Sequence, residues 1–284
     1  MPRGQLILIE GPPGTGRTRL TQELALQCEA QGRAHQWWPE QRNGHPLLRP
    51  YDPAAYPSAD SYGGVLEVQW QNFATRSAAE DVVYLFDSAL LQPGFRALLA
   101  AGCETERIAE ISARLLTALE PLDPRLLYLS RVDAPEGAAA DWHAWRDCCD
   151  HCFAGLSLHR LLVNASRAGP EERLAEALDF VELEHCPLEL DSERGERVRG
   201  RYGDGQVDIA ISLDPAGAEA RFSDRLGIGD RRTLLASADG SFLVAGVDLR
   251  ITPREQSGSI DGLLLMTGDP RLAALPTWLP RIDD

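Results

Sequence analysis

The chain has 284 residues, of which 44% are hydrophobic and 25% charged, an ordinary composition for a globular protein and a length sufficient for two domains. Its 43 acidic residues outnumber 28 basic ones, so the net charge is -15, and the sequence contains no lysine. This acidity argues against binding to nucleic acid or to an anionic membrane, since either partner needs a basic face.

The sequence also lacks the usual marks of a membrane or secreted protein. No apolar run reaches the ~18 residues of a transmembrane helix, and the apolar stretch near the N-terminus is too short for a signal peptide. Six cysteines do not form a disulfide framework and are interpreted as reduced thiols. We therefore expect a cytoplasmic protein.

The first predicted elements surround a glycine-rich loop. The apolar run QLILIE is typical of a buried strand, and the loop after it leads into a helix that ends near Gly32. RAHQWWPEQ is a plausible second strand. Residues 43–61 are rich in proline and tyrosine and show no periodicity, which is typical of a functional or mobile loop.

Strands and helices then alternate up to about residue 185. Helices are predicted at residues 64–79, 105–119 and 141–158 and in GPEERLAEALDFVEL, and strands in DVVYLFD, RLLYLS and HRLLVNAS. Such alternation predicts an α/β fold, a parallel sheet with helices on both faces.

The sequence changes character near residue 190. Beyond a polar, turn-rich segment lie six short apolar runs without intervening helices: QVDIAISL, AEARF, RTLLAS, SFLVAG, DLRITPR and GLLLMTG. They predict a small antiparallel β-barrel or sandwich. We assign residues 1–188 to an α/β domain and residues 189–284 to an all-β domain that packs, dimerises or shapes a pocket.

The strongest motif is GPPGTGRT at residues 11–18, which fits the phosphate-loop spacing G-x-x-x-x-G-K-[ST] at every fixed position except the lysine. Glycines let backbone N–H groups turn inward, and the following helix adds partial positive charge. The nucleotide-binding candidates are Gly11, Pro13, Gly14, Thr15, Gly16, Arg17, Thr18 and Arg19. Thr18 is also a candidate magnesium ligand.

Arg17 occupies the lysine position. A guanidinium keeps the charge and can bind phosphate through two hydrogen bonds, but it is longer and planar. We expect phosphate binding to survive this replacement more easily than the geometry of transfer, where an error of ~1 Å can cost about a hundredfold in rate.

With this loop, the alternating elements and VVYLFDS, the first 185 or so residues resemble the P-loop kinases of the thymidylate-kinase-like group. The resemblance implies that Asp87, at the end of its strand, orients magnesium or takes the acceptor proton. Independently, a carboxylate at the C-terminal end of a parallel strand lies at the ligand-binding edge of the sheet. Capping of a helix start is the alternative role for Asp87.

The resemblance also implies an acceptor pocket after the second strand, with candidates Glu40, Arg42, His45, Trp70 and Arg76. Core packing is the alternative for Trp70, and capping of a loop the alternative for His45. Arg131 and Arg146 are candidates for a lid over the phosphates, or else surface arginines. Asn164 and Arg167 are weaker candidates for contacts to the base.

The segment DWHAWRDCCDHCF contains His143, Cys148, Cys149, His151 and Cys152. Zinc sites usually draw paired ligands from separate elements, whereas these residues fall within one predicted helix. A buried apolar face with free thiols explains them better than a metal site does.

The leading hypothesis is a kinase that uses ATP or GTP with Mg²⁺ and phosphorylates an unidentified small molecule, with Arg17 and Asp87 as catalytic residues and Thr18 and Asp87 as metal ligands. The alternative is a nucleotide-binding sensor or interaction protein derived from such a kinase. A bare NTPase is a third hypothesis, but it has no supporting motif. The barrel-like domain leaves a homodimer open.

Overall fold

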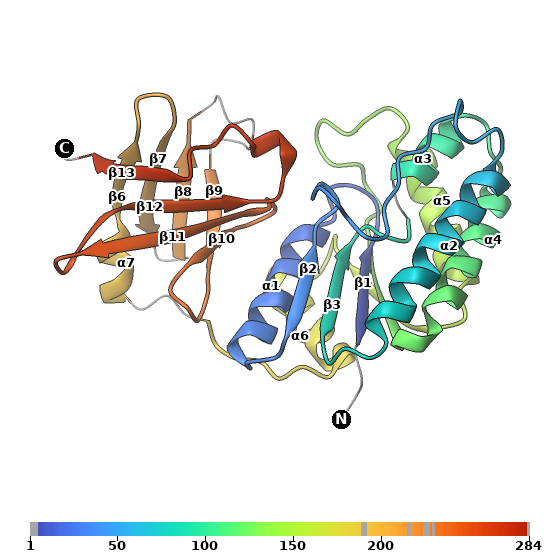
Figure 1. The fold of residues 1–284 in the computed structure, drawn as a ribbon, viewed down its shortest axis with the longest axis horizontal. Coiled ribbons are helices and arrows are strands. Elements are labelled where there is room, and N and C mark those ends of the chain that lie inside the picture. Colours follow the sequence, from blue (N-terminus) through green and yellow to red (C-terminus); the bar gives the residue numbers. More distant parts are fainter. Residues whose placement is uncertain are drawn as a thin grey trace. The chain divides into compact units, whose positions relative to one another are not determined.

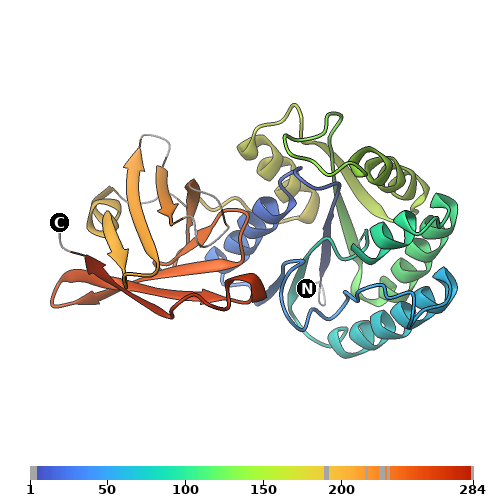
Figure 2. The ribbon, with the colours of Figure 1, turned by 90° about the horizontal axis from the view of Figure 1, so that it is seen from above.

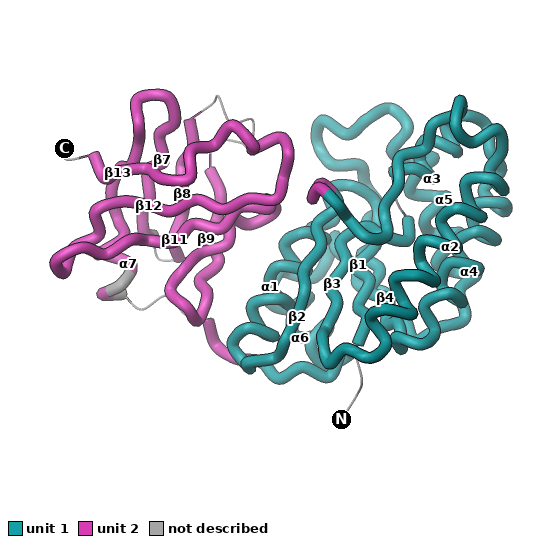
Figure 3. Tube along the Cα trace, in the orientation of Figure 1, with its two compact units in different colours: residues 1–40, 44–185 teal, residues 41–43, 186–284 magenta. Residues whose placement is uncertain are grey.

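The computed structural model describes residues 5–91, 93–188, 192–214, 217–223, 228 and 231–282. The chain forms two compact units (Figure 3). The first comprises residues 1–40 and 44–185, and the second comprises residues 41–43 and 186–284.

The first unit is built on a five-stranded parallel sheet with strand order β2-β3-β1-β4-β5. Its strands are β1 (Leu6–Glu10), β2 (His35–Trp38), β3 (Val83–Asp87), β4 (Pro124–Ser130) and β5 (His159–Asn164). Every residue of β1 and β3 is buried, as continuous apolar runs require when helices cover both faces. Ile9 lies opposite Asp87, so β1 and β3 end at the same edge of the sheet.

Helices cover both faces of this sheet (Figures 1 and 2). One face carries α1 and α6, and the other carries α2, α4 and α5. The helices are α1 (Arg17–Ala30), α2 (Ala59–Ser77), α3 (Pro93–Ala100), α4 (Thr105–Leu119), the 3-10 turn η1 (Glu120–Leu122), α5 (Trp142–Gly155) and α6 (Pro170–Val181). This arrangement confirms the predicted α/β fold.

The helix predicted at residues 64–79 begins earlier than the sequence indicated. Ser58 caps α2 through a reciprocal pair of hydrogen bonds with Ser61, so the helix includes Ala59 to Ser61, which were predicted to belong to the loop. A Cβ atom at Gly63 would lie 3.0 Å from the Ile111 side chain on α4, so a larger residue there would require that side chain to shift. The short helix α3 was not predicted, and α5 ends three residues before the predicted residue 158.

The second unit is a closed antiparallel barrel with strand order β10-β11-β12-β13-β6-β7-β8-β9. It contains a short helix α7 (Ser192–Val198), β6 (Gly200–Gly203), β7 (Asp208–Asp214), β8 (Gly217–Phe222), β9 (Arg231–Ala236), β10 (Phe242–Val244), β11 (Leu249–Gln256), β12 (Ser259–Thr267), the turn η3 (Pro270–Leu272) and β13 (Trp278–Ile282). Of the two predicted architectures, barrel and sandwich, the barrel is confirmed.

Two barrel strands, β6 and β13, were not predicted from the sequence. They pair with each other and so help to close the barrel. In this pairing Arg281 of β13 lies opposite Tyr202 of β6. The four residues of β6 include two glycines, and β13 contains Pro280, so neither segment has the composition of a strand. Among the described residues, no helix has the length and apolar character needed to cross a membrane.

Candidate phosphate-binding site

The loop between β1 and α1 has the backbone that its glycines predict. Gly11, Gly14 and Gly16 have φ angles of 138°, 84° and 90°, a region that other residues rarely enter. The tightest position is Gly11, where an added Cβ atom would lie 2.3 Å from the carbonyl oxygen of Leu129 on β4. Glycine is therefore required at this point both by conformation and by space.

The carbonyl groups of the loop are engaged by side chains. The carbonyl oxygens of residues 12 to 15 each accept a hydrogen bond of 2.9–3.0 Å, donated in order by the side chains of Thr15, Trp142, Arg131 and Arg173. By contrast, the backbone N–H groups of Gly14, Thr15 and Gly16 donate to no other residue that the structure describes. The loop thus offers unpaired donors next to the N-terminus of α1, an arrangement suited to an anion.

Arg17, the first residue of α1, lies among carboxylates. Its Nη2 is 3.4 Å from Oε2 of Glu40 and its Nε is 3.8 Å from Oδ1 of Asp87, and the Arg17 side chain is 12% exposed. Burial acts to lower the pKa of Arg17, but the charges of Asp87, Glu40 and Glu10 outweigh it and raise that pKa. The guanidinium is therefore cationic and held by acidic partners.

Asp87 and Thr18 form the second part of the site. The Thr18 hydroxyl donates a 2.5 Å hydrogen bond to Oδ2 of Asp87, and the Ser88 hydroxyl donates to Oδ1 at 3.2 Å. Asp87 is 1% exposed. A hydroxyl and a carboxylate are the hard oxygen ligands that Mg²⁺ prefers. No group of three or more His, Cys, Asp or Glu residues in the described parts of the chain could hold a metal ion, so magnesium here would need phosphate and water oxygens as well.

Glu10 belongs to this cluster, although the sequence analysis did not select it. It is the last residue of β1 and fully buried, and its two carboxylate oxygens accept hydrogen bonds from the backbone N–H groups of Leu90 and Leu91, at 2.7 and 3.1 Å. Burial raises the pKa of Glu10 to about 7, while these N–H groups and Arg17 act against the rise. A charged residue ending an otherwise apolar strand was the available signal.

The residues predicted near the end of β2 have different surroundings. Glu40 pairs with Arg17, as described above. The buried His45 accepts hydrogen bonds at Nδ1 from the N–H groups of Leu47 and Leu48, so it caps the loop after β2. Arg42 belongs to the second unit, where its guanidinium donates to both carboxylate oxygens of Asp248 at 3.0 and 2.7 Å.

The two candidates on α2 differ in burial. Trp70 is fully buried in the core, and its indole donates to the carbonyl oxygen of Leu47. This is the packing role that the sequence left open for it. Arg76 is on the exposed surface of α2, where its Nε donates to the carbonyl oxygen of Asn72.

The two candidate lid arginines hold backbone groups in this structure. Arg131 donates to the carbonyl oxygens of Gly14 and Asp133. Arg146 donates to the carbonyl oxygen of Val132, pairs with Asp147, and lies 5.7 Å from the centre of the Trp142 ring. Both guanidinium groups thus support the segment that follows β4, and Arg131 also contacts the glycine-rich loop at Gly14.

The remaining candidates on this unit make local contacts. Arg19 pairs along α1 with Glu23 at 2.9 Å, and Oδ1 of Asn164 accepts from the N–H group of Ser166 in the turn where Arg167 lies. Two supporting residues, Trp142 and Arg173, were not selected from the sequence, since each is more than 100 residues from the loop carbonyl it contacts.

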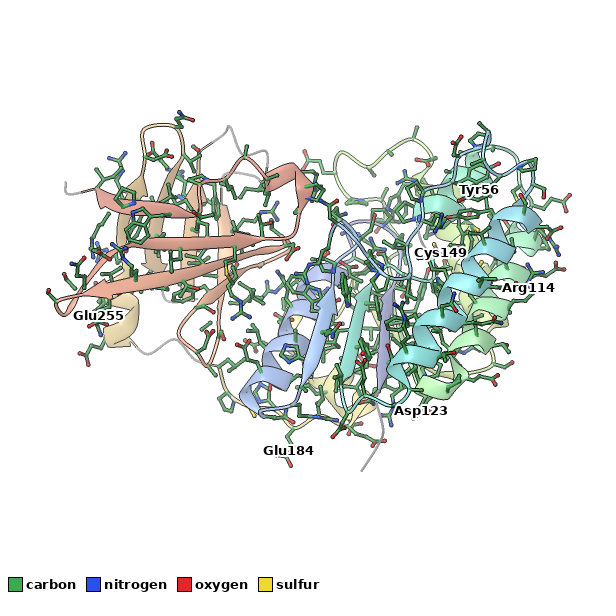
Figure 4. All side chains as sticks on the ribbon, in the orientation of Figure 1. Tyr56, Arg114, Asp123, Cys149, Glu184 and Glu255 are labelled. Carbon is green, nitrogen blue, oxygen red and sulfur yellow. The ribbon has the colours of Figure 1, made fainter. Side chains whose placement is uncertain are left out.

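The cysteines of α5 face the core. Cys148, Cys149 and Cys152 are at most 1% exposed, and Figure 4 labels Cys149 among the side chains of the first unit. Burial raises the pKa of the Cys149 thiol well above its ordinary value. The thiol-lined apolar face inferred from the sequence is therefore present, and the described residues around it form no metal-binding group.

Comparisons with known proteins add little to this geometry. No protein-family model and no curated protein matches the sequence. Among solved structures, the YorR protein of Bacillus subtilis in complex with phosphorylated GDP is similar at 13% identity, covering 64% of this chain and 100% of that one with a TM-score of 0.38. SurE with D-Leu is similar at 12% identity, covering 99% of this chain and 88% of that one with a TM-score of 0.24. At these scores neither likeness bears on function.

Proposed function

We propose that the chain binds ATP or GTP and transfers the terminal phosphoryl group to a small-molecule acceptor. The observation that carries this proposal is the convergence of Arg17, Thr18 and Asp87 beside a loop whose carbonyl groups are engaged and whose N–H groups are not. Phosphoryl transfer depends mainly on positioned charge and donors, with little covalent chemistry required of the protein. This cluster supplies both.

In this proposal the N–H groups of residues 14–16 and the N-terminus of α1 bind the outer phosphates. Arg17 neutralises the charge that develops during transfer. Because its guanidinium lies 3.4 Å from Glu40 and 3.8 Å from Asp87, it exchanges part of these contacts for phosphate oxygens when the nucleotide binds. Its forked shape allows two hydrogen bonds to one phosphate, which compensates for the missing lysine.

Thr18 and Asp87 would hold Mg²⁺, which when bound would neutralise charge between the outer phosphates. The hydrogen bond between them orients the Thr18 hydroxyl, and the Ser88 hydroxyl donates to the other carboxylate oxygen of Asp87. Glu40 contacts Arg17, so an acceptor bound at the end of β2 would lie beside the phosphate loop. That position favours Glu40 as the residue that contacts the acceptor.

A nucleotide sensor is the second candidate, and one observation favours it. Arg131 and Arg146, the candidate lid arginines, donate to the backbone carbonyl groups of Gly14 and Val132. Held in this way, neither supplies the additional cation that kinases of this kind bring to the transferred phosphate. A sensor needs only the binding half of the site.

The experiment is phosphorus NMR of MgATP with the purified protein, followed over several hours. We expect shifted or broadened β and γ signals, with slow ADP formation if water substitutes for the acceptor. Arg17→Ala should abolish both effects. Arg33→Ala, near the other end of α1, is the matched control and should behave like the wild type.

The outcomes separate the candidates. Perturbed signals without ADP formation, and without turnover across a panel of hydroxylated acceptors, would favour the sensor. Unperturbed signals at millimolar protein concentration would contradict both candidates for ATP, and the same measurement with GTP would then complete the test.

A further inference from the structure

The buried carboxylate of Glu10 accepts hydrogen bonds from two consecutive backbone N–H groups. Its Oε1 accepts from the N–H group of Leu90 and its Oε2 accepts from that of Leu91, so the carboxylate at the end of β1 holds the segment that follows β3. The proposed function assigns no role to this residue. Yet the segment it holds begins directly after Asp87.

The segment needs such support because the chain turns sharply there. Ser88 has a φ angle of 60°, a left-handed conformation that is uncommon outside glycine, and its N–H group donates to the carbonyl oxygen of Ile9. Leu90 and Leu91 are buried, so their N–H groups have no access to water and require a protein acceptor. Glu10 is the acceptor for both.

Only an acid supplies both hydrogen bonds. A glutamine at position 10 has one acceptor oxygen, and its amide nitrogen would oppose the second N–H group. The charged groups that act on Glu10 are Arg17 from α1 and Asp87 from β3, and Glu10 in turn acts on the Cys149 thiol of α5. Glu10 therefore belongs to the same electrostatic cluster as the residues proposed to bind phosphate and magnesium.

We propose that Glu10 is a positioning residue that fixes the turn of residues 88–91 and thereby holds Asp87 where it meets Thr18 and Arg17. The proposal rests on the proposed function in that Asp87 is taken as the magnesium-binding carboxylate. Glu10 does not contact the nucleotide. Its effect therefore falls on the magnesium-dependent part of nucleotide binding, because the loop N–H groups, which bind phosphate without the metal, do not depend on the turn.

Two measurements test this proposal. The first is the affinity for ATP, by titration calorimetry, with Mg²⁺ and with EDTA, for the wild type, Glu10→Gln and the control Glu23→Gln, a carboxylate that pairs with Arg19 on α1. At pH 8, where Glu10 is largely ionised, we expect Glu10→Gln to reduce the magnesium-dependent gain in affinity about tenfold, the value of one charge-assisted hydrogen bond, and to leave affinity in EDTA unchanged. The control should leave both affinities unchanged.

The second measurement is amide hydrogen exchange, which requires no ligand. In the wild type the amides of Leu90 and Leu91 should exchange slowly, and in Glu10→Gln they should exchange faster while the amides of β1 and β3 remain protected. Fast exchange of Leu90 and Leu91 in the wild type would overturn the proposal even if the variant fails to fold.

The outcomes distinguish this proposal from the proposed function. If the wild type binds no nucleotide, the proposed function fails, and hydrogen exchange alone decides whether Glu10 fixes the turn. If the wild type binds MgATP and Glu10→Gln keeps the full magnesium-dependent gain, the positioning role is wrong while nucleotide binding stands. An equal loss of affinity with Mg²⁺ and with EDTA would also overturn it, because it would indicate general damage to the loop.

Discussion

The two units treat buried charge differently. In the first unit Glu10, Arg17 and Asp87, from three different elements, converge on one point under the phosphate loop. In the barrel the buried acids Asp248 and Asp269 are each paired with one arginine and accept backbone N–H groups of the turn at residues 268–271. Buried charges that converge are costly for folding, so they indicate a site, whereas single capped acids stabilise turns.

The interior of the barrel also differs from the site region of the first unit. Its core consists of apolar side chains, and pairs such as Arg254–Asp261 and Arg231–Glu219 lie on its surface. Exposed pairs of this kind contribute little to stability. Among the described residues, the buried charges that converge therefore lie in the first unit, whereas the core of the barrel is apolar.

The substitution expected to destabilise the protein most is Gly11→Ala, which adds a methyl group to the glycine-rich loop. Gly11→Ala places a Cβ atom 2.3 Å from the Leu129 carbonyl at a φ angle of 138°, and we expect it to lower the free energy of unfolding by roughly 4 kcal/mol and to abolish MgATP binding. Gly262→Ala in the barrel, where the Cβ atom would meet the Trp278 ring, should destabilise the barrel without affecting MgATP binding. Urea unfolding and calorimetry measure both effects. Loss of MgATP binding in Gly262→Ala would contradict the proposal that MgATP binding depends on the first unit alone.

The second prediction concerns pH. The pKa of Glu10 rises from 4.5 to about 7 on folding, so the folded state retains a proton that the unfolded state loses. The stabilisation is complete below pH 4.5 and is lost as the pH rises through 7. Relative to Glu10→Gln, the wild type should lose on the order of 3 kcal/mol of unfolding free energy between these limits. A constant difference between the two proteins across the same pH series would contradict the buried titration.

The third prediction concerns Asp87, the proposed magnesium ligand. Asp87→Asn keeps the size of the side chain but removes its charge, and we expect phosphoryl transfer to a proven acceptor to fall on the order of a hundredfold. Asp81→Asn, at an exposed position before β3, is the control and should leave the rate unchanged. Steady-state kinetics decide the matter, and unchanged turnover in Asp87→Asn would eliminate its catalytic role.

The last prediction concerns Glu40, whose carboxylate would compete with the phosphates for Arg17 and so change ATP affinity only slightly. Glu40→Gln removes one of the two acidic partners of Arg17, so ATP affinity should rise by a few-fold at most, as for a partly exposed ion pair. Glu23→Gln should leave ATP affinity unchanged. If affinity falls in Glu40→Gln, Glu40 orients Arg17 toward the phosphates instead of competing with them.

The sequence predicted the features that depend on neighbouring residues. The spacing of Gly11, Gly14 and Gly16 determines the loop conformation because each glycine acts on its own backbone angles. The alternation of strands and helices likewise predicted the parallel sheet, and the short apolar runs predicted the series of strands. Both patterns are local, because apolar residues recur along the chain with the period of the strand or helix that buries them. The position of Asp87 at the C-terminal end of a parallel strand was also predicted and is present in the structure, while its role in ligand binding stays a prediction.

The side chains that complete the candidate site from distant parts of the chain could not be predicted from the sequence. Trp142 and Arg173 reach the loop carbonyls from over 100 residues away, and Glu10 holds a segment 80 residues further along the chain. No local pattern encodes such contacts, because they depend on how strands and helices pack. The same holds for Arg131, whose guanidinium contacts the Gly14 carbonyl oxygen, and for closure of the barrel by the glycine-containing β6 and the proline-containing β13. Local sequence patterns thus predict a glycine-rich loop in an α/β unit followed by short β-strands, whereas packing decides which charges meet beneath that loop.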